Sequence, residues 1–232
     1  MQRATGGTTT SITTVAEYDG ASAVRVSATQ LGTRYSAHRA RKIVDEWCDF
    51  LACGPSPITD LTFVTRTPAR LFESLAGQAQ LQSLAVKWGD YDDLSPLTGM
   101  HELTRLKLGG ASSLRTVTPL SQMPQLRELL IDSLRHVHDV SALGSLTRLR
   151  SLEVGGNWMT PRIAHVDSIA FLRRLPELEG LVLHSIIVDD LDYSPLLALD
   201  GLEEVRVMPA RGMRPSHEDL CSAIPALDPL PA

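Results

Sequence analysis

The sequence predicts an α/β solenoid, in which short parallel strands from successive repeats form one curved β-sheet. An apolar pattern returns roughly every two dozen residues through most of the 232-residue chain. One segment near the N-terminus also has the apolar spacing of an amphipathic helix. A single copy of such a pattern cannot bury its apolar side chains alone, so neighbouring copies have to stack on one another. We therefore expect one elongated fold with a continuous core.

The repeated pattern is L-x-x-L-x-L, with Ile, Val or Phe at some positions. Copies separated by 22, 23, 23, 29 and 24 residues begin at Leu81, Leu103, Leu126, Leu149, Leu178 and Leu202. Two earlier copies begin at Ile58 and Ala21, and the 37 residues between those starts leave room for a helix. Alternate residues of a strand face opposite sides, so positions 4 and 6 predict the stacked core. Positions 3, 5 and 7 then form the concave face.

A second motif lies between the strands. It is clearest in Asp93-Leu94-Ser95-Pro96-Leu97 and recurs at 117–120, 140–143 and, more loosely, 191–196. Combined with L-x-x-L-x-L, it resembles the leucine-rich repeats of bacterial internalins over about residues 58–208. The resemblance implies a right-handed parallel solenoid with short 3₁₀ or helical turns on the convex side. Of the asparagines typical of that family after the strand, Asn157 alone matches, so we expect no continuous asparagine ladder.

Residues 1–57 are expected to form an N-terminal cap that continues into the solenoid. Apolar residues of 36–51 recur at i, i+3, i+4 and i+7, which predicts a helix packed on the stack. The pair Asp19-Gly20 separates two strand-like runs, 12–18 and 21–28, and is a common hairpin signal. We therefore expect an antiparallel strand to cover the N-terminal edge of the sheet.

Residues 209–232 are expected to form a short C-terminal cap. The sequence Ser216-His217-Glu218-Asp219 has the form of a capping box that starts a short helix. Pro225, Pro229 and Pro231 would end it. A cap of this kind protects the last repeat of a stack from solvent.

Composition restricts the classes of partner. The net charge of −5 and the isoelectric point near 5.8 argue against nucleic-acid binding, which needs clustered Lys and Arg.

No stretch approaches the roughly 20 apolar residues of a membrane span, and residues 1–20 lack the apolar core of a secretory signal. The three cysteines cannot all pair, which favours the cytoplasm. The excess of Arg over Lys suggests a GC-rich bacterial genome.

The charges expected on the concave face are divided along the chain. Arg25, Lys87, Arg105 and Lys107 fall in the N-terminal half, whereas acidic residues dominate the C-terminal half. Such a face suits oriented protein recognition, and large aromatic side chains are frequent anchors in interfaces. The candidate partner-binding residues are Arg25, Lys87, Trp88, Arg105, Lys107, Glu128, Asp132, Glu153, Trp158, His184 and Arg206. Two alternatives stay open: the charges pair with one another across the sheet, and the tryptophans pack under turns.

Motifs for catalysis are absent from the sequence. It has no nucleophile elbow, phosphate-binding loop, zinc-protease helix or dinucleotide-binding turn. His136, His138 and Asp139, together with Asp132, carry metal-ligating atoms, but we place them on an exposed convex turn. The acidic residues at 189, 190 and 192 lack the spacing of a calcium loop. We expect no catalytic residue, no metal and no cofactor.

These observations favour a non-catalytic module that binds another protein through its concave face. A small cytoplasmic repeat protein of this kind suits an immunity protein that neutralises a cognate toxin. The alternative is an adaptor or regulatory subunit that docks on a signalling enzyme, such as a phosphatase. A metal-dependent enzyme at His136 and His138 is the third hypothesis.

Overall fold

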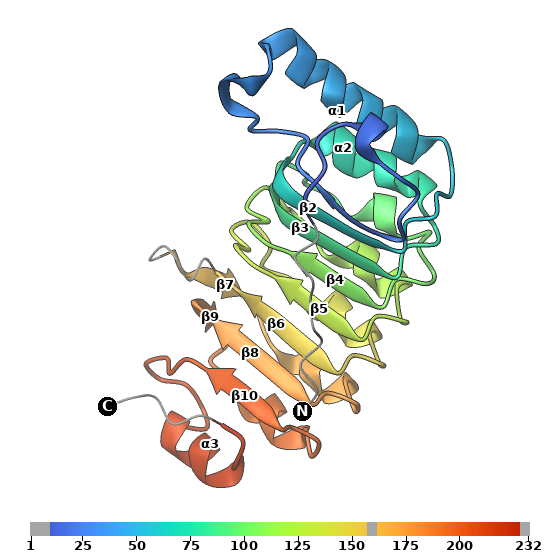
Figure 1. Ribbon diagram of the computed structural model, residues 1–232. Helices are drawn as coiled ribbons and strands as arrows, with labels where there is room; N and C mark the ends of the chain where they lie inside the picture. The colour runs from blue at the N-terminus through green and yellow to red at the C-terminus, as the bar shows by residue number, and fades with distance from the viewer. Residues whose placement is uncertain (1–9, 157–161, 228–232) are drawn as a thin grey trace.

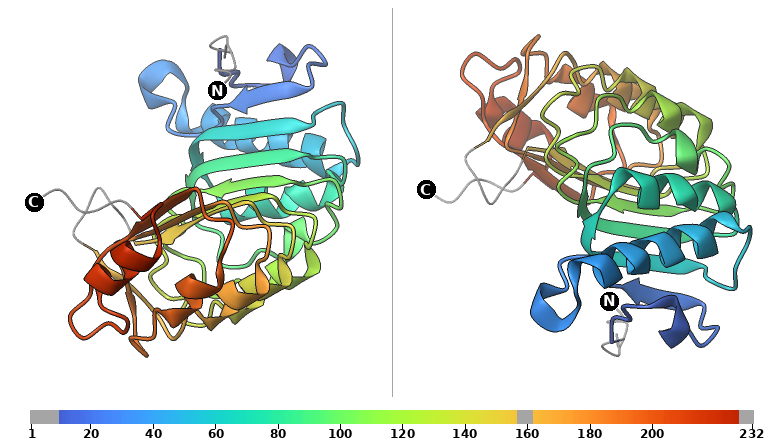
Figure 2. Two further views of the ribbon diagram at one scale, coloured as in Figure 1. Left: turned by 90° about the horizontal axis from the view of Figure 1, so that it is seen from below. Right: turned by 90° about the horizontal axis from the view of Figure 1, so that it is seen from above.

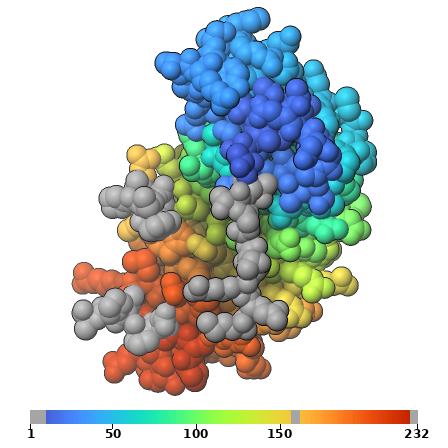
Figure 3. Space-filling view, in the orientation of Figure 1, coloured from blue at the N-terminus to red at the C-terminus, as the bar shows by residue number. Residues whose placement is uncertain are grey.

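The computed structural model describes residues 10–156 and 162–227. Eight strands form one parallel sheet whose spatial order follows the order of the chain (Figure 1). They are β1 (Ala23–Val26), β2 (Asp60–Thr67), β3 (Ser83–Gly89), β4 (Arg105–Leu108), β5 (Glu128–Ile131), β6 (Ser151–Gly155), β8 (Gly180–His184) and β10 (Glu204–Val207). The space-filling view shows the same succession as colour bands from one end of the molecule to the other (Figure 3). The predicted parallel solenoid is confirmed.

Equivalent positions of neighbouring repeats lie side by side in the sheet. Leu84, Leu106 and Leu129 are aligned in register across β3, β4 and β5, and each is at most 2% exposed. Position 6 is buried in the same way, as Leu108 and Ile131 illustrate. A fully buried Leu or Ile side chain contributes about 1.5–3 kcal/mol. The division into a core row and a concave row therefore follows the L-x-x-L-x-L pattern.

Short 3₁₀ turns and two helices line the side opposite the concave face (Figure 2). The turns are η4 (Ser95–Leu97), η5 (Thr118–Gln122), η6 (Ser141–Ser145), η7 (Ala170–Arg174) and η8 (Ser194–Ala198). Those from η5 to η8 pack on one another in sequence. One polar side chain before each turn accepts a hydrogen bond from the backbone N–H two residues later. This capping row consists of Asp93, Thr116, Asp139, Ser168 and Asp192. The turns expected on the convex side are thus present.

The predicted N-terminal helix is confirmed as α1 (Ala37–Ala52). Its N-cap, Ser36, accepts a hydrogen bond from the Arg39 backbone N–H. The helix packs on α2 (Ala69–Glu73) and η3 (Ser74–Gly77). Trp47 is fully buried on this face, and its indole N–H donates to the Thr13 carbonyl oxygen at 2.9 Å.

The predicted antiparallel hairpin is wrong. Ile12 forms an isolated parallel bridge with Val26, so this segment extends the sheet in the same direction as the other strands. Residues 15–17 form the 3₁₀ helix η1 because Thr14 and Glu17 make a capping box. The Glu17 carboxylate accepts from the backbone N–H of Thr13, which lowers its pKa. This local box outweighs the strand propensity of the Thr-rich run.

The C-terminal edge is covered by the end of the described chain. Ser216 and Asp219 form the predicted capping box of α3 (His217–Ala223). Leu227 then makes a parallel bridge to Val205, which supplies a hydrogen-bond partner to the outer edge of β10. An edge protected in this way resists pairing with other chains.

The longest repeat adds a second, small sheet. Its strands β7 (Ala164–Val166) and β9 (Ile186–Val188) pair in parallel beyond the C-terminal ends of β6 and β8.

The three cysteines are free, with Cys48 half-buried and Cys53 exposed. Among the described residues, no helix has the length and apolar content that a bilayer crossing requires.

Gln78 is a buried polar group that joins the end of α1 to the repeats. Its side-chain amide donates to the carbonyl oxygens of Leu51 and Gly54, and its oxygen accepts from the Ser56 hydroxyl. We expect Gln78→Leu to lower the free energy of unfolding by about 3 kcal/mol, because buried acceptors lose their donors. Urea unfolding measures this loss. The exposed Gln122→Leu is the control, and an equal effect of both substitutions would contradict the role of Gln78.

Candidate protein-binding face

The concave face consists of positions 3, 5 and 7 of the eight strands, which are exposed or half-buried except for Gly155. The register aligns position 5 across the sheet in a central row of Arg25, Thr62, Ala85, Lys107, Leu130, Glu153, Val182 and Arg206. A parallel first row holds position 3, in which Arg105 lies beside Glu128. Four of the five Lys and Arg candidates therefore lie on β1, β3 and β4, and the acidic candidates lie on or directly after β5 and on β6, whereas Arg206 lies on β10.

The Lys and Arg candidates of β1, β3 and β4, the basic half of the face, have few ion-pair partners in the described part of the chain. Lys87 and Lys107 are exposed, and neither makes an ion pair within the described part of the chain. Arg105 approaches Asp60 at 3.8 Å across the intervening strand, with both side chains more than 40% exposed. An exposed pair at this distance contributes little to stability. The alternative of mutual charge pairing thus applies weakly to Arg105 and to neither lysine.

The acidic half contains a more compact arrangement. The His184 ring lies 3.5 Å from a Glu153 carboxylate oxygen, and its side chain is 16% exposed. A side chain at Gly155 would not fit here, since a Cβ would collide with the His184 carbonyl oxygen and crowd the ring Nδ1. Arg206 lies 3.7 Å from Glu204 on its own strand. In this half Arg206 and Glu204 form an exposed ion pair, and the His184 ring lies beside the Glu153 carboxylate.

Trp88 lies at the rim of the concave face. It is half-buried, and the Arg66 guanidinium stands over its ring at 5.7 Å from the centroid. The indole therefore presents part of its surface to solvent, as an anchor requires, while Arg66 holds it in place. Trp158 lies outside the described residues.

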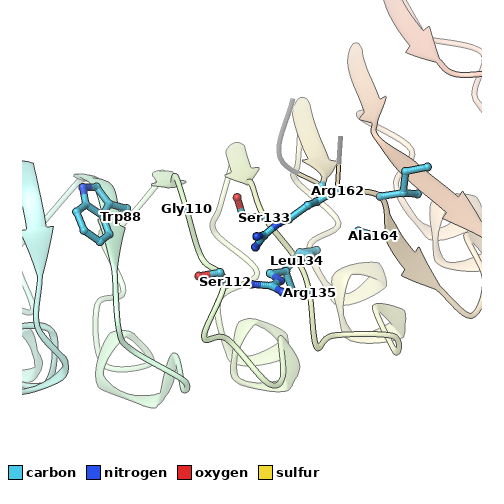
Figure 4. Close-up of a pocket in the computed structure, with 10 residues that line it drawn as sticks. Trp88, Gly110, Ser112, Ser133, Leu134, Arg135, Arg162 and Ala164 are labelled. Carbon is cyan, nitrogen blue, oxygen red and sulfur yellow. The ribbon is translucent and has the colours of Figure 1, made fainter. Parts of the chain in front are cut away.

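A polar pocket of about 800 Å³ opens next to Trp88, beyond the C-terminal ends of β4 and β5. Arg162 extends toward Ser133, and Arg135 toward Ser112 (Figure 4). Within the described ranges neither arginine makes an ion pair, and both side chains line one space. Sequence reasoning missed both residues because they follow the strands and fall outside positions 3, 5 and 7. The sequence signal for these two arginines lies in the loops that follow the strands, which can be compared from repeat to repeat.

A solved structure with a similar fold is an internalin (inlF) from Listeria monocytogenes. It is 22% identical and matches 64% of this chain and 39% of its own, with a TM-score of 0.51. The chain has the leucine-rich-repeat fold. This agrees with the resemblance seen in its repeats.

Two further leucine-rich-repeat structures are less similar. Internalin C2 (inlC2) from Listeria monocytogenes is 23% identical over 61% of this chain and 66% of its own, with a TM-score of 0.40. The other is the LRR ectodomain of the Arabidopsis thaliana membrane receptor kinase GASSHO1/SCHENGEN3 in complex with CASPARIAN STRIP INTEGRITY FACTOR 2. It is 16% identical over 65% of this chain and 17% of its own, with a TM-score of 0.47. The chain thus spans 39% of the first internalin. No protein-family model and no curated protein matches the sequence.

The structure does not bring Asp132 to the histidine motif of the third hypothesis. His136, His138 and Asp139 are exposed on the turn after β5, whereas Asp132 lies on the concave side of that repeat. Asp139 belongs to the capping row, where its carboxylate accepts from Ser141. The motif therefore does not form one ligand set with Asp132.

Asp132 gives the leucine-rich-repeat face a testable pH dependence. Burial raises the pKa of its carboxyl group, and the hydrogen bond from Ser133 opposes that shift only in part. A raised folded-state pKa means that the folded protein binds the proton more tightly, so stability falls as pH rises through that pKa. Asp132→Asn should therefore raise the melting temperature at pH 7. The gain should vanish below the usual carboxyl pKa, and a gain independent of pH would contradict this assignment.

Proposed function

We propose that this protein is a non-catalytic binding module that recognises a partner protein through its concave face. The observation that carries this proposal is the pair of exposed, uncompensated lysines, Lys87 and Lys107, beside an acidic half on the same sheet. Charges of both signs in fixed positions orient a partner and accelerate its association. The arginine pocket next to Trp88 extends the basic half and suits an acidic side chain of the partner.

The size of the face supports a protein partner over a small metabolite. Eight strands spaced about 4.8 Å apart span roughly 34 Å. That width accommodates a patch of about 800 Å² per partner, the usual size of a stable interface. Position 5 also contributes Ala85, Leu130 and Val182, so apolar contacts accompany the charges. Contacts spread over several strands favour a folded surface as the ligand.

Among protein partners, we favour a toxin. An immunity protein can act by occlusion alone, which a rigid charged face provides without chemistry of its own. Three free cysteines suit the reducing cytoplasm in which such a protein would act. The alternative is an adaptor or regulatory subunit docked on a signalling enzyme, which would use the same face.

Affinity purification followed by mass spectrometry tests the proposal. The wild-type protein is compared with R105E/K107E and with R41E/K42E, which reverses one arginine and one lysine on the exposed side of α1. We expect the wild type and R41E/K42E to capture the same partner and R105E/K107E to lose it. A captured secreted toxin supports immunity, and a kinase or phosphatase supports the alternative. Equal capture by all three would refute the concave face as the binding surface.

A further inference from the structure

Three metal-ligating side chains converge on the edge of the solenoid. His138, Asp167 and Asp189 each offer one ligand atom, and these atoms lie within 4.8 Å of one another. The residues follow β5, β7 and β9, so they come from three different segments of the chain. All three are exposed, and none belongs to positions 3, 5 or 7 of the concave face.

Backbone hydrogen bonds fix the spacing of the three residues. The Asp167 N–H donates to the His138 carbonyl oxygen at 3.0 Å. The Asp189 N–H donates to the Val166 carbonyl oxygen at 2.8 Å, where β7 and β9 are in register. Asp167 therefore lies on the segment between those that carry His138 and Asp189. Preorganised ligands of this kind lose little conformational entropy when an ion binds.

The fold itself does not use the side chains of His138 and Asp167. In the adjacent capping row, Asp139 and Asp192 accept hydrogen bonds from Ser141 and Ser194, and these bonds lower the pKa of both carboxyls. His138 and Asp167 lie one position before capping residues. Within the described part of the chain, their side chains make no hydrogen bond and no ion pair. Turn formation thus accounts for the capping row and leaves the convergence of His138 and Asp167 unexplained.

Charge and donor chemistry both point to a cation. The carboxylates of Asp167 and Asp189 are held close together, and in the described ranges no Lys or Arg pairs with either. Asp189 does have one partner, the Nδ1 of His165 at 2.7 Å. An imidazole nitrogen with carboxylate oxygens is a mixed set that suits Zn²⁺, whereas Mg²⁺ prefers oxygen ligands alone.

We propose that His138, Asp167 and Asp189 form a surface site for a divalent transition-metal ion, with Zn²⁺ as the best match. His165 orients the Asp189 carboxylate through its hydrogen bond. Water or a group of another molecule completes the coordination. The bound ion links three successive segments, so it stabilises the folded state by mass action. This site is independent of the proposed concave face.

Equilibrium dialysis against Zn²⁺ with elemental analysis of the full chain tests the site. We expect one ion per chain in the wild type and in His136→Ala, which removes an exposed imidazole two residues away. His138→Ala and D167N/D189N should each weaken binding by at least about tenfold, and His165→Ala by roughly tenfold. Excess Mg²⁺ should not compete. The melting temperature of the wild type, but not of His138→Ala, should rise with Zn²⁺.

One other pair of donors needs its own control. The Cys221 Sγ lies 3.5 Å from the His217 Nδ1, and thiolates bind Zn²⁺ well. His217→Ala should retain the ion. Loss of the ion in His217→Ala, its retention in His138→Ala, or the absence of stoichiometric binding to the wild type would each overturn the proposal. Partner capture should be unchanged in His138→Ala, which separates this test from that of the concave face.

Discussion

Reversal of Arg105 and Lys107 together to glutamate should weaken partner binding by at least about 100-fold, on the order of 3 kcal/mol. Both side chains are exposed on β4, and Lys107 has no ion-pair partner in the described part of the chain. Two reversals exchange attraction for repulsion at the centre of the proposed basic half. Isothermal titration calorimetry with the purified partner measures the change.

The same variant should remain folded. Arg105 gives up an exposed contact with Asp60, and the carboxylate introduced in its place would lie beside Glu128, which together cost less than about 1 kcal/mol. Thermal unfolding monitored by circular dichroism checks this. R105A/K107A separates loss of attraction from new repulsion and should show a smaller loss of affinity. Unchanged affinity in the reversed variant would exclude both residues from the interface.

Trp47→Ala should lower the free energy of unfolding by about 3–5 kcal/mol. Trp47 is fully buried on the inner side of α1, and its ring and that of Phe50 pack edge to face with centroids 5.7 Å apart. The substitution leaves a cavity and deprives the Thr13 carbonyl oxygen of its donor. Guanidinium unfolding monitored by circular dichroism at the helix signal measures the loss.

Lys42→Ala, on the exposed side of the same helix, is the matched control and should change stability by less than about 0.5 kcal/mol. A stack of repeats depends on both of its ends, and α1 packs on η1, α2 and η3 at the N-terminal end, so loss of Trp47 weakens that end. If Trp47→Ala unfolds at the same denaturant concentration as the control, α1 does not act as the anchor of the stack.

The repeats could be predicted because every copy repeats the same physical constraint. Leu106 and Leu129 had to be buried, since they occupy position 4 of segments that stack at a constant spacing. The helix α1 followed from its apolar stripe. The position of each concave charge then followed from strand alternation alone.

Two kinds of feature could not be predicted from the sequence. One depends on competition between local hydrogen bonds and strand pairing, and the other on the paths of the loops. The capping box of Thr14 and Glu17 competes with strand pairing, and propensity does not rank such alternatives. Arg135 and Arg162 share a pocket because β7 pairs with β9 outside the main sheet. The convergence of His138 with residues 29 and 51 positions later depends on those same loop lengths.

Lysine footprinting tests the central proposal most directly, because the chain has only three lysines: Lys42, Lys87 and Lys107. Lys42 lies on α1, and the other two lie on the concave face. The complex with the captured partner is acetylated briefly, and each site is quantified by mass spectrometry against the free protein. We expect the partner to protect Lys87 and Lys107 and to leave Lys42 fully reactive. Protection of Lys42 alone, or of no lysine, would contradict recognition through the concave face.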